Sequence, residues 1–447
     1  MTMLPTTSPP PAPAAPSRRG PVALAIVLAV VLAGAVLALA LRDGGDGGGG
    51  VGVGPGATVA PARQGVFDEL MAQVAEVRGL EWTGPLDLKV VPKDELVELV
   101  RESFTEDTDE AEVEAVEATL KLLGLLPADL DYGRLIEDLL AEQVLGYYDP
   151  KTRELFVGGE GGDTGAFDVA TRLVIVHEMV HALTDQVFNF GPATIALDEQ
   201  DRTEELTAYS SLLEGDAVLT TELWAERHLT STERLSAALG GGGDISTFLR
   251  APEYVRQSLF FPYREGLEFV RGLHRAGGFA AVDAAYANPP TSTEHILRPA
   301  TYQAGQQPSP PPMPDLAAAT GCAQVYTGVV GQFDMRAVLD THLTLADADR
   351  AVEGWNGDAL SVVRCGNSLG LANRWATDPG TDPARLVEAL GRWARQWSGG
   401  GQGPTADGRF TGPRGSGRVV RAGPNVELVL AQDASTRDLL VRALSPS

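Results

Sequence analysis

The segment LVIVHEMVHALTDQ, residues 173–186, places two histidines and a glutamate inside an otherwise apolar run. Apolar side chains recur at positions such as Leu173, Val176 and Val180, which is the spacing of a helix, so a helix over residues 167–187 is predicted. Burying imidazole and carboxylate groups among Val, Ile, Met and Leu costs free energy unless another group compensates for the lost water. A metal ion is the candidate partner.

The spacing of the polar residues indicates the kind of site. His177 and His181 are four residues apart, so a helix projects both rings from one face, within reach of one zinc ion. Glu178 follows the first histidine and can reach a water at the metal. This H-E-x-x-H pattern is typical of metalloproteases, in which the glutamate is the general base and zinc lowers the pKa of water toward about 7. The competing interpretation is a chance match that contains ordinary core histidines.

A catalytic zinc needs a third protein ligand, and the next predicted helix supplies candidates. This helix, residues 203–228, contains the sequence LLEGDA at positions 212–217. A helix–loop–helix return brings Glu214 back to the same metal, so we predict Glu214 as the third ligand. Asp216 then either supports the ligands or competes with Glu214 for the ion. The alternative for Glu214 is a half-exposed acidic helix residue.

The N-terminus predicts a membrane anchor. Residues 1–20 form a Pro- and Ala-rich tail that cannot build a core, and residues 21–41 are an uncharged apolar run. A run of roughly 20 apolar residues is long enough to cross a bilayer. The arginines before it place the tail in the cytoplasm and the rest of the chain outside, as a single-pass membrane protein, or as a secreted one if the segment is cleaved. Residues 42–64 read as a Gly-rich tether.

The remaining chain divides at a proline-rich stretch. Residues 65–305 are predicted to form one domain, residues 306–315 a stiff linker, and residues 316–447 a C-terminal α+β module. Cys322 and Cys365 both lie in this module, and in an oxidising compartment they are expected to form a disulfide.

Charge argues against one class of partner. The formal net charge of −25 disfavours non-specific binding to nucleic acid, because such binding needs a basic face. We therefore expect a protein or peptide substrate, contact with the membrane through the N-terminal helix, and no nucleic acid.

The quoted residues resemble gluzincin-type zinc metallopeptidases, whose ligands are the two histidines and a later glutamate. More narrowly, the chain is similar to a little-characterised group of bacterial exported zincin-like proteins. The shared segments are GYYDP (146–150), HEMVHALTDQ (177–186), LEGDA (213–217) and PPTSTEHIL (289–297). The resemblance implies a zincin-like α+β domain, with a small sheet on the metal helix and a helical second half, His177, His181 and Glu214 as zinc ligands, and Glu178 as base.

The chain departs from this pattern in several places. Val218 stands where thermolysin-like gluzincins have an aspartate, and the narrower group tends to have Gln and His at the positions of His295 and Arg298. Tyr263 is a candidate for stabilising the oxyanion, or else a buried structural tyrosine. Asp185, one turn after His181, either orients that ring or faces solvent.

Together these features predict a membrane-anchored, extracytoplasmic zinc peptidase that hydrolyses peptide bonds with zinc-activated water. A catalytically inactive zinc-binding protein that acts as a binding or scaffold module is the first alternative. A tethered surface-interaction protein without a metal is the second.

Overall fold

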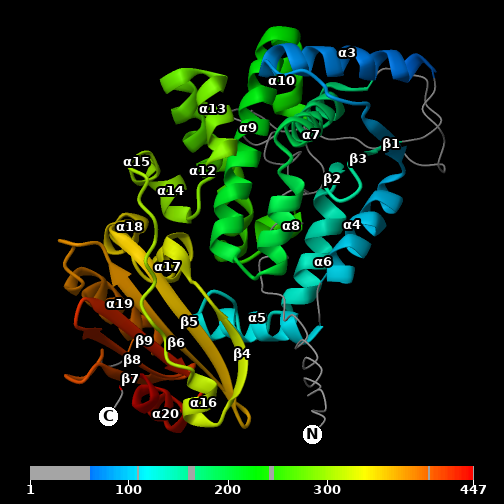
Figure 1. The fold of residues 1–447 in the computed structure, drawn as a ribbon. Coiled ribbons are helices and arrows are strands. Elements are labelled where there is room, and N and C mark those ends of the chain that lie inside the picture. Colours follow the sequence, from blue (N-terminus) through cyan, green and yellow to red (C-terminus); the bar gives the residue numbers. More distant parts are fainter. Residues whose placement is uncertain (1–60, 108–109, 160–166, 241–245, 401–402, 446–447) are drawn as a thin grey trace, which may run out of the picture.

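The computed structural model describes residues 61–107, 110–159, 167–240, 246–400 and 403–445, and they form a mixed α+β protein (Figure 1). This level of the predicted fold class is confirmed. The predicted membrane segment, residues 21–41, lies outside the described residues. Within the part of the chain that the structure describes, no helix is long and apolar enough to cross a membrane.

The first part of the chain surrounds a three-stranded sheet with helices. Its elements are α3 (Pro61–Arg78), β1 (Asp87–Val91), α4 (Lys93–Asp107), α5 (Glu110–Leu123), α6 (Tyr132–Gln143), β2 (Gly146–Asp149), β3 (Glu154–Gly158) and α7 (Val169–Phe188). The strand order is β1-β3-β2, in which β1 is parallel and β2 antiparallel to β3. Strands β2 and β3 therefore form an antiparallel hairpin before α7, and α7 packs against both strands.

The middle of the chain is helical. It contains α8 (Gly191–Glu199), α9 (Thr203–His228), α10 (Ser231–Gly240), α11 (Ser246–Arg250), α12 (Glu253–Gly277), α13 (Phe279–Ala287), α14 (Thr293–Leu297) and α15 (Pro299–Gln303). Helix α9 contacts α7 on one side and lies along α12 on another. It is the central element of this half (Figure 1).

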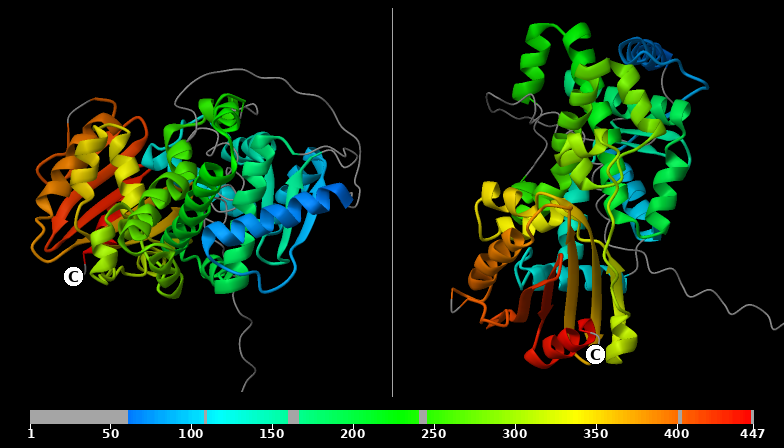
Figure 2. Two further views of the ribbon diagram at one scale, coloured as in Figure 1. Left: turned by 90° about the horizontal axis from the view of Figure 1, so that it is seen from above. Right: turned by 60° about the vertical axis from the view of Figure 1, so that its left-hand side comes forward.

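The C-terminal part is a six-stranded antiparallel sheet with helices on both faces. Its elements are α16 (Leu316–Thr320), β4 (Ala323–Gly328), α17 (Gly331–Asp340), α18 (Leu345–Val352), β5 (Trp355–Cys365), β6 (Ser368–Thr377), α19 (Ala384–Trp397), β7 (Arg409–Gly412), β8 (Gly415–Ala422), β9 (Asn425–Ala431) and α20 (Ala434–Leu444). The strand order is β4-β5-β6-β9-β8-β7. Figure 2 shows the sheet with α16 and α20 near one end and α17 to α19 beside it. The predicted disulfide between Cys322 and Cys365 is formed.

The C-terminal part and the rest of the described chain share one continuous hydrophobic core. Helix α5, from the first half, packs on β6 and β9, and Trp397 donates a hydrogen bond from Nε1 to the Leu122 carbonyl (2.9 Å). The proline-rich stretch runs along the surface of the C-terminal sheet: Ser309 donates to the Asn356 carbonyl, and the Pro312 carbonyl accepts from Arg374. This stretch is therefore held against the module along its length.

Two glycines set the distance between α9 and α12. A methyl group added at Gly215 would lie 2.3 Å from the Gly266 carbonyl oxygen, and one added at Gly266 would lie 2.2 Å from the Ser211 carbonyl oxygen. The two helix backbones therefore touch at this crossing. Because Gly215 sits between Glu214 and Asp216, this contact also fixes the position of both acidic residues.

Several carboxyl groups lie at the boundary between the C-terminal part and the helical middle of the chain. Glu204, in the first turn of α9, accepts hydrogen bonds from the amide and hydroxyl of Thr293 (2.7 and 2.8 Å). Asp334 accepts from the Tyr254 hydroxyl (3.2 Å), and the fully buried Asp358 accepts from four donors. Burial raises the pKa of Glu204 to about 8 and that of Asp334 to about 7, and the charge of Asp358 adds to both effects. The folded protein therefore holds protons here that a free carboxyl group has already lost.

We expect Gly215→Ala to lower the free energy of unfolding by about 2 kcal/mol or more, because the new methyl group meets a backbone carbonyl that cannot move aside. Gly272→Ala, in α12, is the matched control, since nothing lies within 4 Å of its added methyl. Helix propensity predicts that the control gains about 0.5–1 kcal/mol. Chemical denaturation measures both variants, and equal effects would contradict the close crossing.

We expect stability to fall as the pH rises between about pH 5 and pH 8, because over this range carboxyl groups with raised pKa values bind more protons in the folded than in the unfolded state. Glu204→Gln keeps an oxygen that accepts from Thr293 and removes the ionisation, so its melting temperature is expected to fall less over this range. Glu205→Gln, whose side chain pairs with Arg202, should keep the wild-type slope. Equal slopes in all three proteins would contradict the assignment.

Candidate metal centre

Helix α7 is buried on all sides over its central part. Asp168 caps its start by accepting a hydrogen bond from the Thr171 amide (2.7 Å), and Asn189 ends it in a left-handed conformation (φ 54°). Every residue from 173 to 185 is buried. A helix enclosed on all faces has no need of a polar stripe, which explains the uninterrupted apolar residues around its two histidines.

Three polar atoms from α7 and α9 converge in this interior. His177 Nε2 lies 3.1 Å from Glu214 Oε2, His181 Nε2 lies 3.3 Å from the same oxygen, and the two Nε2 atoms are 3.1 Å apart. None of the three residues is more than 5% exposed. The structure thus brings together the two predicted histidines and Glu214 in a group that could hold a metal ion.

Buried atoms without partners indicate that the group is chemically incomplete. Among the described residues, Glu178 Oε1, His177 Nδ1 and the Tyr263 hydroxyl are buried with no hydrogen-bond partner. Native proteins rarely leave such atoms unpaired, because each loses its water without compensation. Two imidazole nitrogens and a carboxylate oxygen are also a typical three-ligand set for zinc. The residues present therefore fit a metal ion with a further water or ligand.

The charge states of His177 and Glu214 suit cation binding, whereas a metal ion would have to displace a proton from His181. Burial opposes that proton, but the neighbouring Glu214 raises the pKa of His181 to about 9. Burial lowers the pKa of His177, which favours the neutral ring that a metal requires. Burial alone would raise the pKa of Glu214, but the two histidines beside it lower this pKa to about 2. Glu214 is therefore an ionised carboxylate inside the core.

Glu178 is held by the neighbouring strand. Its Oε2 accepts a hydrogen bond from the Tyr148 amide on β2 (3.1 Å), while Oε1 is free. Gly146 allows this approach, since a methyl group there would lie 2.7 Å from Val174 and 3.2 Å from Glu178 Cγ. Burial raises the pKa of Glu178 to about 8, and the nearby His181 opposes this shift. The glutamate is thus fixed in orientation and has a high proton affinity.

Asp216, which the sequence suggests as a possible competitor of Glu214 for the metal, forms hydrogen bonds with other residues instead. Both of its oxygens lie 3.0 Å from Arg78 Nε, and it also accepts from the Tyr286 hydroxyl (2.9 Å). Arg78 is fully buried and extends to Asp283 (2.6 Å). The Asp216 carboxylate therefore anchors α9 to α3 and α13.

Asp185 does not take the predicted position beside His181. Its oxygens accept from the Tyr148 hydroxyl (2.9 Å) and the Gly191 amide (2.8 Å), and Arg153 lies 3.4 Å away. Among the described residues no hydrogen bond joins it to His181. The carboxylate is fully buried, so the solvent-facing alternative is also wrong.

Two other candidates have different surroundings. The Tyr263 ring is stacked on His177, with 6.2 Å between centroids, and its hydroxyl lies near Glu214 without a well-formed hydrogen bond. Burial, and then the charge of Glu214, raises the pKa of Tyr263 well above its ordinary value, so the hydroxyl keeps its proton. His295 is hydrogen-bonded to the Thr291 amide and the Gln306 carbonyl, and it is not part of the metal group.

Residues 321–440 match a family model described as Domain of unknown function (DUF8575), which covers most of the C-terminal module and none of the metal centre. No curated protein matches the chain. A solved structure from Chloroflexus aurantiacus, described as a "putative hydrolase with a novel fold", is similar over 62% of this chain and 97% of its own, with a TM-score of 0.35 and 17% identity. So low a similarity carries no argument about chemistry, and the function has to be inferred from the site.

We expect Arg78→Met to lower the free energy of unfolding by about 3–5 kcal/mol, because it leaves the buried Asp216 carboxylate without its cation. The matched control is Arg227→Gln, which removes an ion pair with Glu76 between the same two helices, α9 and α3. Both side chains of that pair are largely exposed, so the control should cost less than about 1 kcal/mol. Urea denaturation measures both, and a small effect of Arg78→Met would contradict the anchoring role.

Proposed function

We propose that this protein is a zinc-dependent peptidase in which His177, His181 and Glu214 hold the metal and Glu178 is the general base. The observation that carries the proposal is the convergence of the two Nε2 atoms and Glu214 Oε2 beside the half-satisfied carboxylate of Glu178. Zinc bound there would polarise a peptide carbonyl and lower the pKa of water. The proposed ligand set is a nitrogen-rich one that zinc prefers over magnesium or calcium.

The chain's own residues account for the proton transfers. Glu178 is held by Tyr148 through one oxygen, so its free oxygen can take a proton from the attacking water and pass it to the leaving amine. Tyr263 keeps its proton and carries an unpaired hydroxyl near Glu214, so it is the candidate donor to the substrate carbonyl oxygen.

The proposed location rests on the N-terminal sequence. An apolar segment at residues 21–41 preceded by two arginines would anchor the chain in the cell membrane with the peptidase outside the cytoplasm. Its substrates would then be extracytoplasmic proteins or peptides.

One observation favours a second candidate, a zinc-binding protein without turnover. His177, Glu178 and Glu214 are no more than 2% exposed, so a peptide cannot reach them in this conformation. A peptidase would have to open the contacts around α7 and α12, whereas a structural zinc site is closed by nature.

Hydrolysis of a fluorogenic peptide library by the purified full-length chain separates these functions. We expect Glu178→Gln to reduce hydrolysis at least about 100-fold, because general acid–base catalysis contributes that much, and to leave the zinc content unchanged. Glu226→Gln, an exposed substitution on α9, should retain full activity.

Each other outcome has a definite meaning. A wild-type chain that binds zinc and cleaves no peptide would support the non-catalytic candidate. Equal hydrolysis by wild type and Glu178→Gln would show that the measured activity belongs to another protein, and would contradict the proposed base.

A further inference from the structure

A cavity of about 830 Å³ lies in the C-terminal module, and its lining residues all follow the metal centre in sequence. Its walls are α18, α19, the segment 404–408 and strand β8. Its volume falls within the range of about 300–1,000 Å³ that small-molecule sites occupy. The cavity and the proposed peptidase centre share no residue, so a ligand bound in the cavity would not depend on the proposed function.

Arginine dominates the polar lining of this cavity. Five arginines line it, against two acidic residues: Arg350, Arg385, Arg392, Arg395 and Arg421, with Asp347 and Glu388. The whole chain carries a net charge of −25, so an excess of positive charge at one cavity is a local departure. A concave surface lined by one sign of charge concentrates ligands of the opposite sign.

The acidic groups nearby leave these arginines available. Arg350 and Arg392 share a single carboxylate, that of Asp347. Arg385 pairs with Glu353 at 3.2 Å, and Arg421 pairs with Asp382 at 3.3 Å. Such exposed pairs contribute only about 0–1 kcal/mol, so an incoming oxyanion can replace or join them.

One guanidinium has no carboxylate partner. Arg395 packs against Gly403, where an added methyl group would lie 2.9–3.2 Å from its guanidinium atoms. Among the described residues Arg395 forms no ion pair. Its charge therefore remains to be balanced by water or a ligand.

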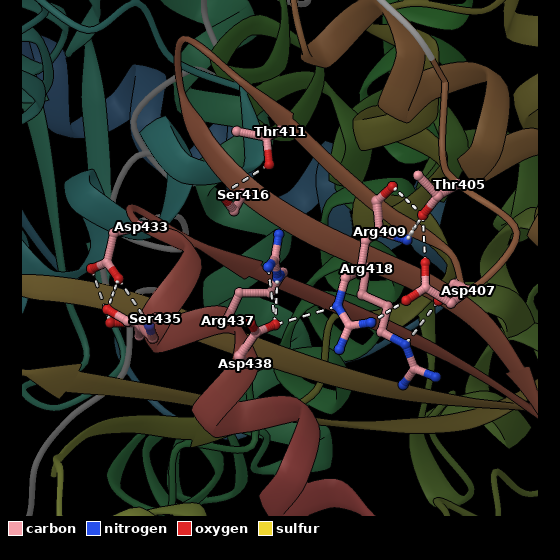
Figure 3. Close-up of polar contacts among 11 residues, drawn as sticks. Thr405, Asp407, Arg409, Thr411, Ser416, Arg418, Asp433, Ser435, Arg437 and Asp438 are labelled. Atoms are coloured by element: carbon pink, nitrogen blue, oxygen red, sulfur yellow. Dashed lines mark hydrogen bonds and ion pairs between the residues drawn. The ribbon is translucent and has the colours of Figure 1, made fainter.

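The segment at one wall is held by hydrogen bonds of its own (Figure 3). Thr405 and Arg409 are joined by three hydrogen bonds, donated by the Thr405 amide (2.9 Å), the Thr405 hydroxyl (3.0 Å) and the Arg409 amide (3.1 Å). Arg409 also pairs with Asp407 and with Asp438 (3.3 Å), and Arg418 donates to the Asp407 carbonyl (3.1 Å). These two arginines are committed to the wall, which leaves the α18 and α19 arginines and Arg421 to face a ligand.

We propose that this cavity binds a small organic anion that carries two or more phosphate or carboxylate groups. Guanidinium groups bind both oxyanions through paired hydrogen bonds, and several around one cavity suit a ligand with several charges. The lining also includes apolar residues that would contact the body of such a ligand: Ala351, Val387, Ala389, Pro404 and Val419.

Isothermal titration calorimetry on the purified full-length chain tests this site with two probes, glucose 1,6-bisphosphate and benzene-1,3,5-tricarboxylate. We expect saturable binding of at least one, weakened by added sodium chloride, and weakened about tenfold or more in Arg392→Gln/Arg395→Gln, which loses two charge-assisted contacts. Preference for the first probe would identify phosphate esters, and preference for the second would identify carboxylates.

The matched control is Arg364→Gln/Arg442→Gln, which removes the same charge from exposed positions of the module outside the cavity. It should bind within about twofold of wild type, because long-range charge effects are screened. Should the α19 variant fail to fold, protection of Arg392 and Arg395 from phenylglyoxal by the bound probe, mapped by mass spectrometry on the wild-type chain, supports the site. Absence of binding by wild type, no protection of these arginines, or equal weakening in both double variants would overturn the proposal.

Discussion

The stability of this structure depends on how its buried charged and polar groups are compensated by hydrogen bonds and ion pairs. Helix α7 is enclosed by protein over residues 173–185, yet it carries two imidazoles and two carboxylates into the interior. Each of these groups has lost its water, and hydrogen bonds satisfy some of them completely and others only in part. Asp185 is fully paired through Tyr148 and Gly191, whereas His177 and Glu178 keep unpaired atoms in the same buried interior. Under the proposed function, this difference separates the structural carboxylate of Asp185 from the catalytic one of Glu178 on the same helix.

Helix α9 joins this centre to the rest of the molecule. Its first turn places Glu204 at the boundary with the C-terminal half, its middle supplies Glu214, and Asp216 ties it to Arg78 on α3. The Gly215–Gly266 contact brings α12, and with it Tyr263, to the same point. The position of Glu214 is therefore fixed from three directions, which is what a pre-organised metal ligand requires.

The local elements could be predicted from sequence, but their long-range partners could not. The helices predicted over residues 167–187 and 203–228 agree with α7 and α9 to within two residues. The α+β character of the C-terminal module was also predicted, but its central strand β6 was not. Its sequence, SLGLANRWAT, has a glycine and four polar residues where a continuous apolar run would signal a central strand.

The role of single polar residues depended on contacts between distant segments. Nothing in the sequence around Arg78 indicates that it meets Asp216, which is why Asp216 stayed a rival ligand. Asp185 was placed by helix periodicity, but the tertiary contacts with Tyr148 and Gly191 decided its role. The arginine-lined cavity could not be predicted from the sequence either, because its arginines come from three separate stretches of an acidic chain.

Metal content tests the central claim most directly. Elemental analysis of the purified full-length chain, beside Glu214→Ala and the double variant His177→Ala/His181→Ala, would show whether these three side chains hold an ion. The account predicts about one zinc per wild-type chain, much less in Glu214→Ala and none in the double variant, because a stable zinc site needs at least three protein ligands. A wild-type chain without metal after reconstitution, or the same zinc content in all three proteins, would contradict it.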